Sequence, residues 1–153
     1  MILWVKHHAW LHATPGSDKA ENKDDRSRAK RMNLDLHDID MPPLDGADWL
    51  IEWLFDAGPV GNDGMGQRGL TWSELQAWRD LTGTLITAPE ARALRTLSQA
   101  YAAASAAAQK EHCKPFWESP QIAEIQARQS EQAGNALAML FRAKAAASQS
   151  AAS

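Results

Sequence analysis

A segment in the middle of the chain has apolar residues on more than one side of a predicted helix. It runs from about Gly46 to Ala57, with Asp45 placed to cap its start and Gly58 to end it. An acidic stripe recurs at every fourth position, and most other positions are apolar. The stripe is Asp48, Glu52 and Asp56, and the apolar positions are Trp49, Leu50, Ile51, Trp53, Leu54 and Phe55. Because a surface helix usually buries a stripe roughly 100° wide, this pattern predicts either a central core helix or a helix held between the domain and a partner.

Two further helices are predicted by their start signals. Thr71-Trp72-Ser73-Glu74 and Thr87-Ala88-Pro89-Glu90 both place a glutamate three residues after a threonine, which is the spacing of a capping box. The first of these helices is predicted to stop at Gly83, and the second to reach about Lys110. The second has an apolar face of Leu94, Leu97 and Tyr101 and an opposite face of Arg92, Arg95 and Gln99. We expect the first face to be buried, and the second to be solvated or to bind an acidic partner or a phosphate.

Residues 58–69, between the first two helices, contain five glycines. This composition is too glycine-rich for a helix or a strand and predicts a flexible loop. Met65 and Arg68 are expected to lie on this mobile loop, beside the start of a helix. Loops of this kind often carry recognition residues.

The two ends of the chain give weaker patterns. Residues 1–13 are apolar with three histidines, which we interpret as a strand or a short docking segment, and residues 14–32 are expected to form a mobile linker or a solvated helix. A last helix is predicted from about Pro120 to Ala147, weakened at Gly134 and followed by a frayed tail. Its middle is polar, so it is expected to pack only at its ends or to associate with another copy or a partner helix.

These elements predict an all-α fold with about three packed helices, a C-terminal helix and flexible termini. The expected organisation is a partly mobile N-terminal segment over residues 1–40, a helical core domain over 41–117, and a C-terminal helix with a frayed tail over 118–153. A chain of 153 residues can bury a core without a metal or a disulfide.

Composition narrows the classes of function. The net charge of −3 argues against tight nucleic-acid binding, which needs several basic contacts. Cys113 is the only cysteine, so an intramolecular disulfide is impossible and a reducing cytosol is expected. No apolar run approaches the roughly 18 residues of a membrane span. The seven tryptophans suit either a core or an interface and do not distinguish between them.

Candidate chemical sites are weak. His8 and His12 would share a helix face as possible metal ligands beside His7, but the glutamate of a metalloprotease motif is absent. His112 and Cys113 are adjacent and so generally point apart, which disfavours a catalytic pair. Residues 64–69 match G-x-G-x-x-G without the strand and parallel sheet that a dinucleotide loop needs. We therefore expect no catalytic residues, no metal site, no cofactor and no enzymatic activity.

The helices over 72–82 and 88–110 also allow a helix-turn-helix, in which Arg92 and Arg95 would contact DNA. The five-residue connection, Gly83 to Thr87, is long for that motif. A small DNA-binding regulator is therefore an alternative, and it requires both arginines to face outward on a basic patch.

A series of ordered pieces between Met41 and about Trp117 covers about half of the chain. They are Pro42-Pro43-Leu44, Trp49-Leu50-Ile51-Glu52-Trp53-Leu54-Phe55, Gly58-Pro59, Gly64-Met65-Gly66, Leu70-Thr71-Trp72-Ser73-Glu74-Leu75-Gln76-Ala77-Trp78, Thr82-Gly83, Ala88-Pro89-Glu90-Ala91-Arg92-Ala93-Leu94-Arg95 and Leu97-Ser98-Gln99-Ala100-Tyr101. In this order they resemble bacteriophage tail assembly chaperones, which are encoded in the tail gene cluster of long-tailed phages. The chain is similar to the downstream part of the longer product that a ribosomal frameshift makes in that family.

The resemblance implies a non-enzymatic role in the host cytoplasm: binding the tape-measure protein, keeping it soluble and recruiting tail-tube subunits. Such a chaperone is usually absent from the finished tail, whereas a structural component, the other alternative, would remain in it. A chaperone for a long helical protein needs exposed aromatic and apolar surface ringed by polar residues. The expected partner-binding residues are Trp49, Trp53, Phe55, Met65, Arg68, Trp72, Trp78, Arg92 and Arg95.

Overall fold

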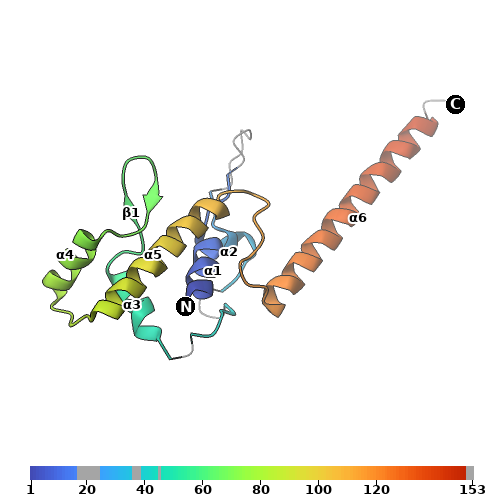
Figure 1. Ribbon diagram of the computed structural model, residues 1–153. Helices are drawn as coiled ribbons and strands as arrows, with labels where there is room; N and C mark the ends of the chain where they lie inside the picture. Colours follow the sequence, from blue (N-terminus) through green and yellow to red (C-terminus); the bar gives the residue numbers. More distant parts are fainter. Residues whose placement is uncertain (17–24, 36–38, 45, 151–153) are drawn as a thin grey trace. The chain divides into compact units, whose positions relative to one another are not determined.

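The computed structural model describes residues 1–16, 25–35, 39–44 and 46–150. Within these residues the chain forms six helices and one two-stranded sheet, which confirms the predicted all-α fold class (Figure 1). The chain divides into two compact units, Met1–Trp117 and Glu118–Ser153.

The first unit contains five helices and one β-hairpin. The hairpin lies between the third and fourth helices, and its two strands are antiparallel, with Gly61 opposite Arg68. In chain order the elements are α1 (Ile2–His12), α2 (Arg28–Arg31), α3 (Asp48–Asp56), β1 (Gly61–Asn62), β2 (Gln67–Arg68), α4 (Trp72–Thr82) and α5 (Ala88–Ala108).

The hydrophobic core of this unit is built from α1, α3, α4 and α5. Leu94 and Leu97 are 0% and 2% exposed, which confirms the predicted apolar face of α5. The acidic stripe of α3 is exposed as its spacing predicts, while Leu50, Ile51 and Leu54 are buried. The buried side chains of the core are Val5, Leu50, Ile51, Leu54, Leu70, Leu75, Trp78, Leu94 and Leu97.

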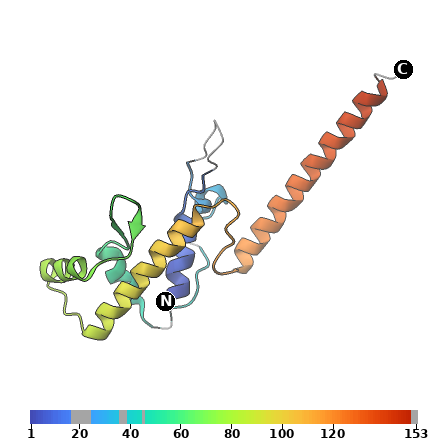
Figure 2. The same cartoon turned by 45° about the horizontal axis from the view of Figure 1, so that its top comes forward.

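Of the two alternatives for residues 1–13, the strand is wrong, because Ile2–His12 form a helix. Helix α1 packs along α5, and both views show the two helices side by side (Figures 1 and 2). Val5, His7 and Leu11 are all buried, so α1 is covered on more than one side. A helix covered in this way lacks the single apolar stripe that identifies a surface helix in a sequence.

Part of the expected mobile linker also belongs to the packed unit, through Arg28. Its guanidinium is buried, and Nη2 donates to the carbonyl oxygens of Ala108 at 2.9 Å and Lys110 at 2.6 Å. Nη1 donates to the carbonyl of Glu111 at 3.4 Å, and the group lies 5.0 Å from the ring centroid of Trp10. Arg28 therefore caps the C-terminal end of α5, where backbone carbonyls lack helical partners. Residues 17–24 of the expected linker lie outside the described residues.

The predicted helix starts and stops hold in the centre of the chain, with one shift. Helix α3 begins at Asp48 with Ala47 at its N-cap, two residues later than expected, and Asp45 lies outside the described residues. Both capping boxes are present, and α4 ends at Gly83, whose φ of 68° is the left-handed conformation that glycine adopts without strain.

The prediction that residues 58–69 form a flexible loop without strands is wrong over two short segments. Residues 61–62 and 67–68 pair as a short hairpin, with a turn at Gly64 and Gly66 that has positive φ. The glycines here permit the tight turn that the hairpin needs.

A buried serine attaches this hairpin region to α5. The Oγ of Ser98 accepts a hydrogen bond from the backbone N–H of Leu70 at 2.7 Å and donates to the carbonyl of Pro59 at 2.7 Å. One side chain thus pairs with a backbone group on each side of the hairpin. Without it, the N–H of Leu70 and the carbonyl of Pro59 would lack this hydrogen-bond partner near the core.

Ser98→Ala is expected to lower the free energy of unfolding by about 1–2 kcal/mol, because it leaves the Leu70 N–H and the Pro59 carbonyl without their partner. Urea unfolding followed by tryptophan fluorescence measures the change. Ser105→Ala, on the same helix, is the matched control and should change the free energy of unfolding by less than about 0.5 kcal/mol. Equal effects of the two substitutions would contradict the role assigned to Ser98.

The second unit is one long helix, α6 (Pro120–Ser150), which extends three residues beyond the predicted end. Described side chains from Gln126 to Arg142 are exposed. Gly134 lies within the helix, and a Cβ added there would meet nothing within 4 Å. In the described residues, no helix is both long and apolar enough to cross a membrane.

Gly134→Ala is expected to stabilise α6 by about 1 kcal/mol, since glycine in a helix interior is less favourable than alanine by that amount. Circular dichroism at 222 nm during thermal unfolding of the full chain should show higher helicity at intermediate temperatures. Ala138→Gly, one turn further on and also exposed, should have the opposite effect. No change in helicity with either variant would contradict a continuous α6.

Candidate functional site

The nine residues expected to bind a partner differ widely in exposure. Trp49 and Trp72 are 44% and 50% exposed, and Met65 is 97% exposed. Arg92 is also exposed, while Trp53, Phe55, Arg68 and Arg95 are half-buried. Trp78 is 8% exposed and its indole Nε1 donates to the carboxylate of Asp56 at 2.7 Å. Trp78 is therefore a core residue, and its assignment as a partner contact does not fit its burial.

Arg68 is held in place by the residue that caps α4. Its Nη1 and Nη2 donate to the two carboxylate oxygens of Glu74 at 2.8 and 3.0 Å. The hydrogen bonds from Arg68, together with those from the N–H and hydroxyl of Thr71, lower the pKa of Glu74 to about 2. The bidentate pair fixes the hairpin to the start of α4. Arg68 is thus committed to an internal contact, contrary to the expectation that it lies on a mobile loop.

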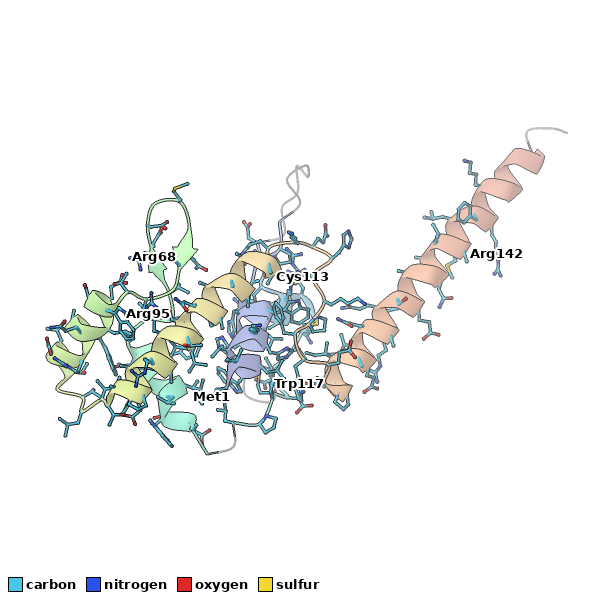
Figure 3. The ribbon with its side chains drawn as sticks, viewed as in Figure 1. Met1, Arg68, Arg95, Cys113, Trp117 and Arg142 are labelled. Carbon is cyan, nitrogen blue, oxygen red and sulfur yellow. The ribbon has the colours of Figure 1, made fainter. Side chains whose placement is uncertain are left out.

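Arg95 lies against an aromatic ring rather than against an acid. Its guanidinium carbon is 5.1 Å from the centroid of Trp72, on the side of α5 where α4 and the hairpin lie (Figure 3). Nε is buried and has no hydrogen-bond partner, and Arg95 forms no ion pair with any residue that the structure describes. A DNA-binding helix-turn-helix required both arginines to face outward on a basic patch, whereas Arg95 is half-buried against Trp72.

A groove that the sequence did not indicate separates α4 from the start of α5. We call it the α4–α5 groove; it has a volume of about 300 Å³. A second hollow of about 440 Å³ continues from it along the α4–α5 connection and shares Arg79 and Ile86 with it. Leu85, which lines this second hollow, is 94% exposed. The residues that line the groove are Trp72, Leu75, Gln76, Arg79, Ile86 and Ala91.

The histidines of α1 are packed into an aromatic cluster. His8 stacks on His12 with ring centroids 4.2 Å apart, and Trp4 stacks on the His8 ring at 5.1 Å. His7 is fully buried between Trp10 and Trp117, and its two ring nitrogens have no hydrogen-bond partner. Burial lowers the pKa of His7 to about 4; it also lowers that of His8 to about 4, with a further contribution from His12. The described residues contain no group of three or more His, Cys, Asp or Glu able to hold a metal ion.

The other two candidate motifs have simple structural settings. Cys113 is half-buried and its Sγ lies 3.5 Å from the carbonyl of Lys114, while His112 is exposed. The G-x-G-x-x-G match over residues 64–69 is part of an antiparallel hairpin rather than the strand-to-helix turn of a dinucleotide site.

Comparison with known proteins gives no match. No family model, no curated protein and no solved structure is similar to this chain.

Proposed function

We propose that this chain is a non-enzymatic assembly chaperone for the tail of a long-tailed bacteriophage. It binds the tape-measure protein, the tail-tube protein or both, in the cytoplasm of the infected host. The proposal draws on the ordered resemblance over residues 41–117 and on one structural observation, the exposed aromatic and aliphatic surface around α4. Trp72 on α4 and Leu85 in the connection that follows it expose 50% and 94% of their surface.

The physical argument concerns what such a surface does in water. Fully burying one large apolar side chain is worth about 1.5–3 kcal/mol, so several exposed together favour association with another apolar surface. Tryptophan is enriched at the centres of protein interfaces. A chaperone that covers apolar segments of a long helical protein until assembly needs a surface of this composition.

The test is a pull-down of the tagged full chain from cells that express the complete tail gene cluster, with mass spectrometry of the eluates and of purified particles. We expect recovery of the tape-measure or tail-tube protein and absence of this chain from the particles. Trp72→Ala should reduce recovery at least 10-fold without a change in thermal stability larger than that of Leu140→Ala, an exposed control on α6.

Two other results would contradict the proposal and favour a stated alternative. A chain that remains in purified particles would be a structural tail component. Recovery of DNA without either tail protein would favour a regulator, although the half-buried position of Arg95 against Trp72 argues against that class.

A further inference from the structure

We propose that the α4–α5 groove binds an amphipathic helix of a different protein, one that presents aliphatic side chains on one face and a carboxylate beside them. The proposal rests on the chaperone function for its biological meaning. Its chemistry rests on the residues that line the groove and on Arg95, which lies against Trp72.

The first argument is the shape of the groove. Trp72, Leu75, Gln76 and Arg79 recur at i, i+3, i+4 and i+7, which places them on one face of α4. At a rise of 1.5 Å per residue, this face is roughly 10 Å long. A helix bound in a groove places anchor side chains at i, i+3 or i+4, and i+7, which span the same length. Ala91 forms part of the opposite wall, and its small side chain leaves the space open.

The second argument is the rigidity of the floor. Leu75 is 4% exposed and belongs to the hydrophobic core, and Ile86 packs against that core. An aliphatic side chain that enters the groove therefore meets a preformed apolar surface and does not have to order it first.

The third argument is charge. Arg95, one helical turn after Ala91, has no carboxylate partner among the described residues, and its buried Nε has no acceptor. Two acids on α4 and α5 are already engaged: Glu90 accepts from the N–H and hydroxyl of Thr87, and Asp80 pairs with Arg79 at 2.6 Å. A partner carboxylate next to Trp72 would give Arg95 the ion pair that no described residue supplies.

The same charge pattern argues against α6 as the occupant, in this chain or in a second copy. Leu137, Leu140 and Phe141 are exposed and apolar, but Arg142 and Lys144 follow them directly. Placing that segment in the groove would bring two cations toward Arg95. The charges therefore favour an acidic helix from a different protein.

The experiment is a selection of helical peptides from a displayed library against the purified full chain, followed by affinity measurements on the enriched synthetic peptides. We expect enrichment of aliphatic residues at helical spacing with Asp or Glu beside them. Ala91→Trp, which fills the groove, should weaken binding at least 10-fold. Ala103→Trp, at an exposed position of the same helix, should leave binding unchanged.

Charge reversal tests the role of Arg95 directly. Arg95→Glu should weaken binding of the acidic peptides and strengthen that of versions carrying Lys in place of Glu, whereas Arg142→Glu on α6 should do neither. If Ala91→Trp lowers stability, Gln76→Trp fills the groove from an exposed position on α4. Lack of enrichment, enrichment of neutral or basic peptides, or equal binding to the filled-groove variants would overturn the proposal.

The outcomes separate this inference from the proposed function. If tail proteins are recovered equally by the wild-type chain and by Ala91→Trp, the chaperone role stands and the groove is not its binding site. If acidic helices bind the groove but no tail protein is recovered, the groove stands and the chaperone role fails.

Discussion

Replacing Arg28 with methionine is expected to lower the free energy of unfolding of the Met1–Trp117 unit by about 3 kcal/mol. Methionine keeps an apolar contact with Trp10 but removes the donors to three carbonyl oxygens at the end of α5. The carbonyl of Ala108 is buried, so water cannot easily replace the charge-assisted hydrogen bond that it loses. Arg28→Lys keeps the charge without the forked geometry and should have an intermediate effect.

Urea unfolding at neutral pH, followed by circular dichroism, measures this change. Lys30→Met is the matched control, because Lys30 is an exposed basic residue of the same short helix. We expect the control to change the free energy of unfolding by less than about 0.5 kcal/mol. A loss below about 1 kcal/mol for Arg28→Met would show that the end of α5 does not depend on this cap.

Lowering the pH from 7 to 4.5 is expected to destabilise the same unit by about 4 kcal/mol, with His7 and His8 contributing about 2 kcal/mol each after allowance for partial solvent screening. The pKa of each is lowered from 6.5 to about 4 in the folded state. The unfolded chain therefore binds more protons than the folded chain between these values. Stability is complete above about pH 6.5 and falls as the pH drops toward 4.

The surroundings of the two rings explain why they resist protonation. His7 faces Trp10 and Trp117, with the charge of Asp40 as the only contribution that favours its charged form. His8 faces Trp4, Phe55, His12 and the hydroxyl of Tyr101, whose oxygen is 3.4 Å from Nδ1.

Urea unfolding at a series of pH values from 7.5 to 4.5 measures the dependence. His7→Phe should remove about half of it, because phenylalanine fills a similar volume between the two tryptophans and does not titrate. His112→Gln changes an exposed histidine and should leave the dependence intact. A wild-type free energy of unfolding that is constant between pH 7 and 5 would contradict the burial of both rings.

The sequence predicted the parts of the fold whose signals are local. Thr71 and Glu74 are three residues apart, and the spacing of Leu94 and Leu97 identifies the buried face of α5 without reference to other segments. Arg28 was missed because its partners are about eighty residues away in the chain. Helix α1 was missed because burial of His7 places a polar residue type where a core pattern requires an apolar one.

The candidate site likewise contains some residues that the sequence identified and others that it did not. Trp49 and Trp72 were identified by residue type and proved to be exposed, although type alone gave no way to separate them from the buried Trp78. Nothing in the sequence marked Ala91 or Ile86 as residues that line a groove. Ala91 is a small helical residue and Ile86 lies in the α4–α5 connection, and they form walls of the groove only because α4 and α5 lie beside each other. The unpaired state of Arg95 likewise depends on where every carboxylate lies in space.

The ion pair between Arg68 and Glu74 has a consequence for how a bound partner would be held. Glu74 accepts hydrogen bonds from Arg68 of the hairpin and from the N–H of Thr71. These bonds hold the hairpin and the first turn of α4 together as one unit. This unit carries Met65 in the turn of the hairpin and Trp72 at the start of α4, where it lines the groove. A partner that contacts both Met65 and Trp72 therefore meets two side chains held at a fixed distance from each other. The second contact then forms as an intramolecular step, at high effective concentration, and adds avidity without further ordering of the chain.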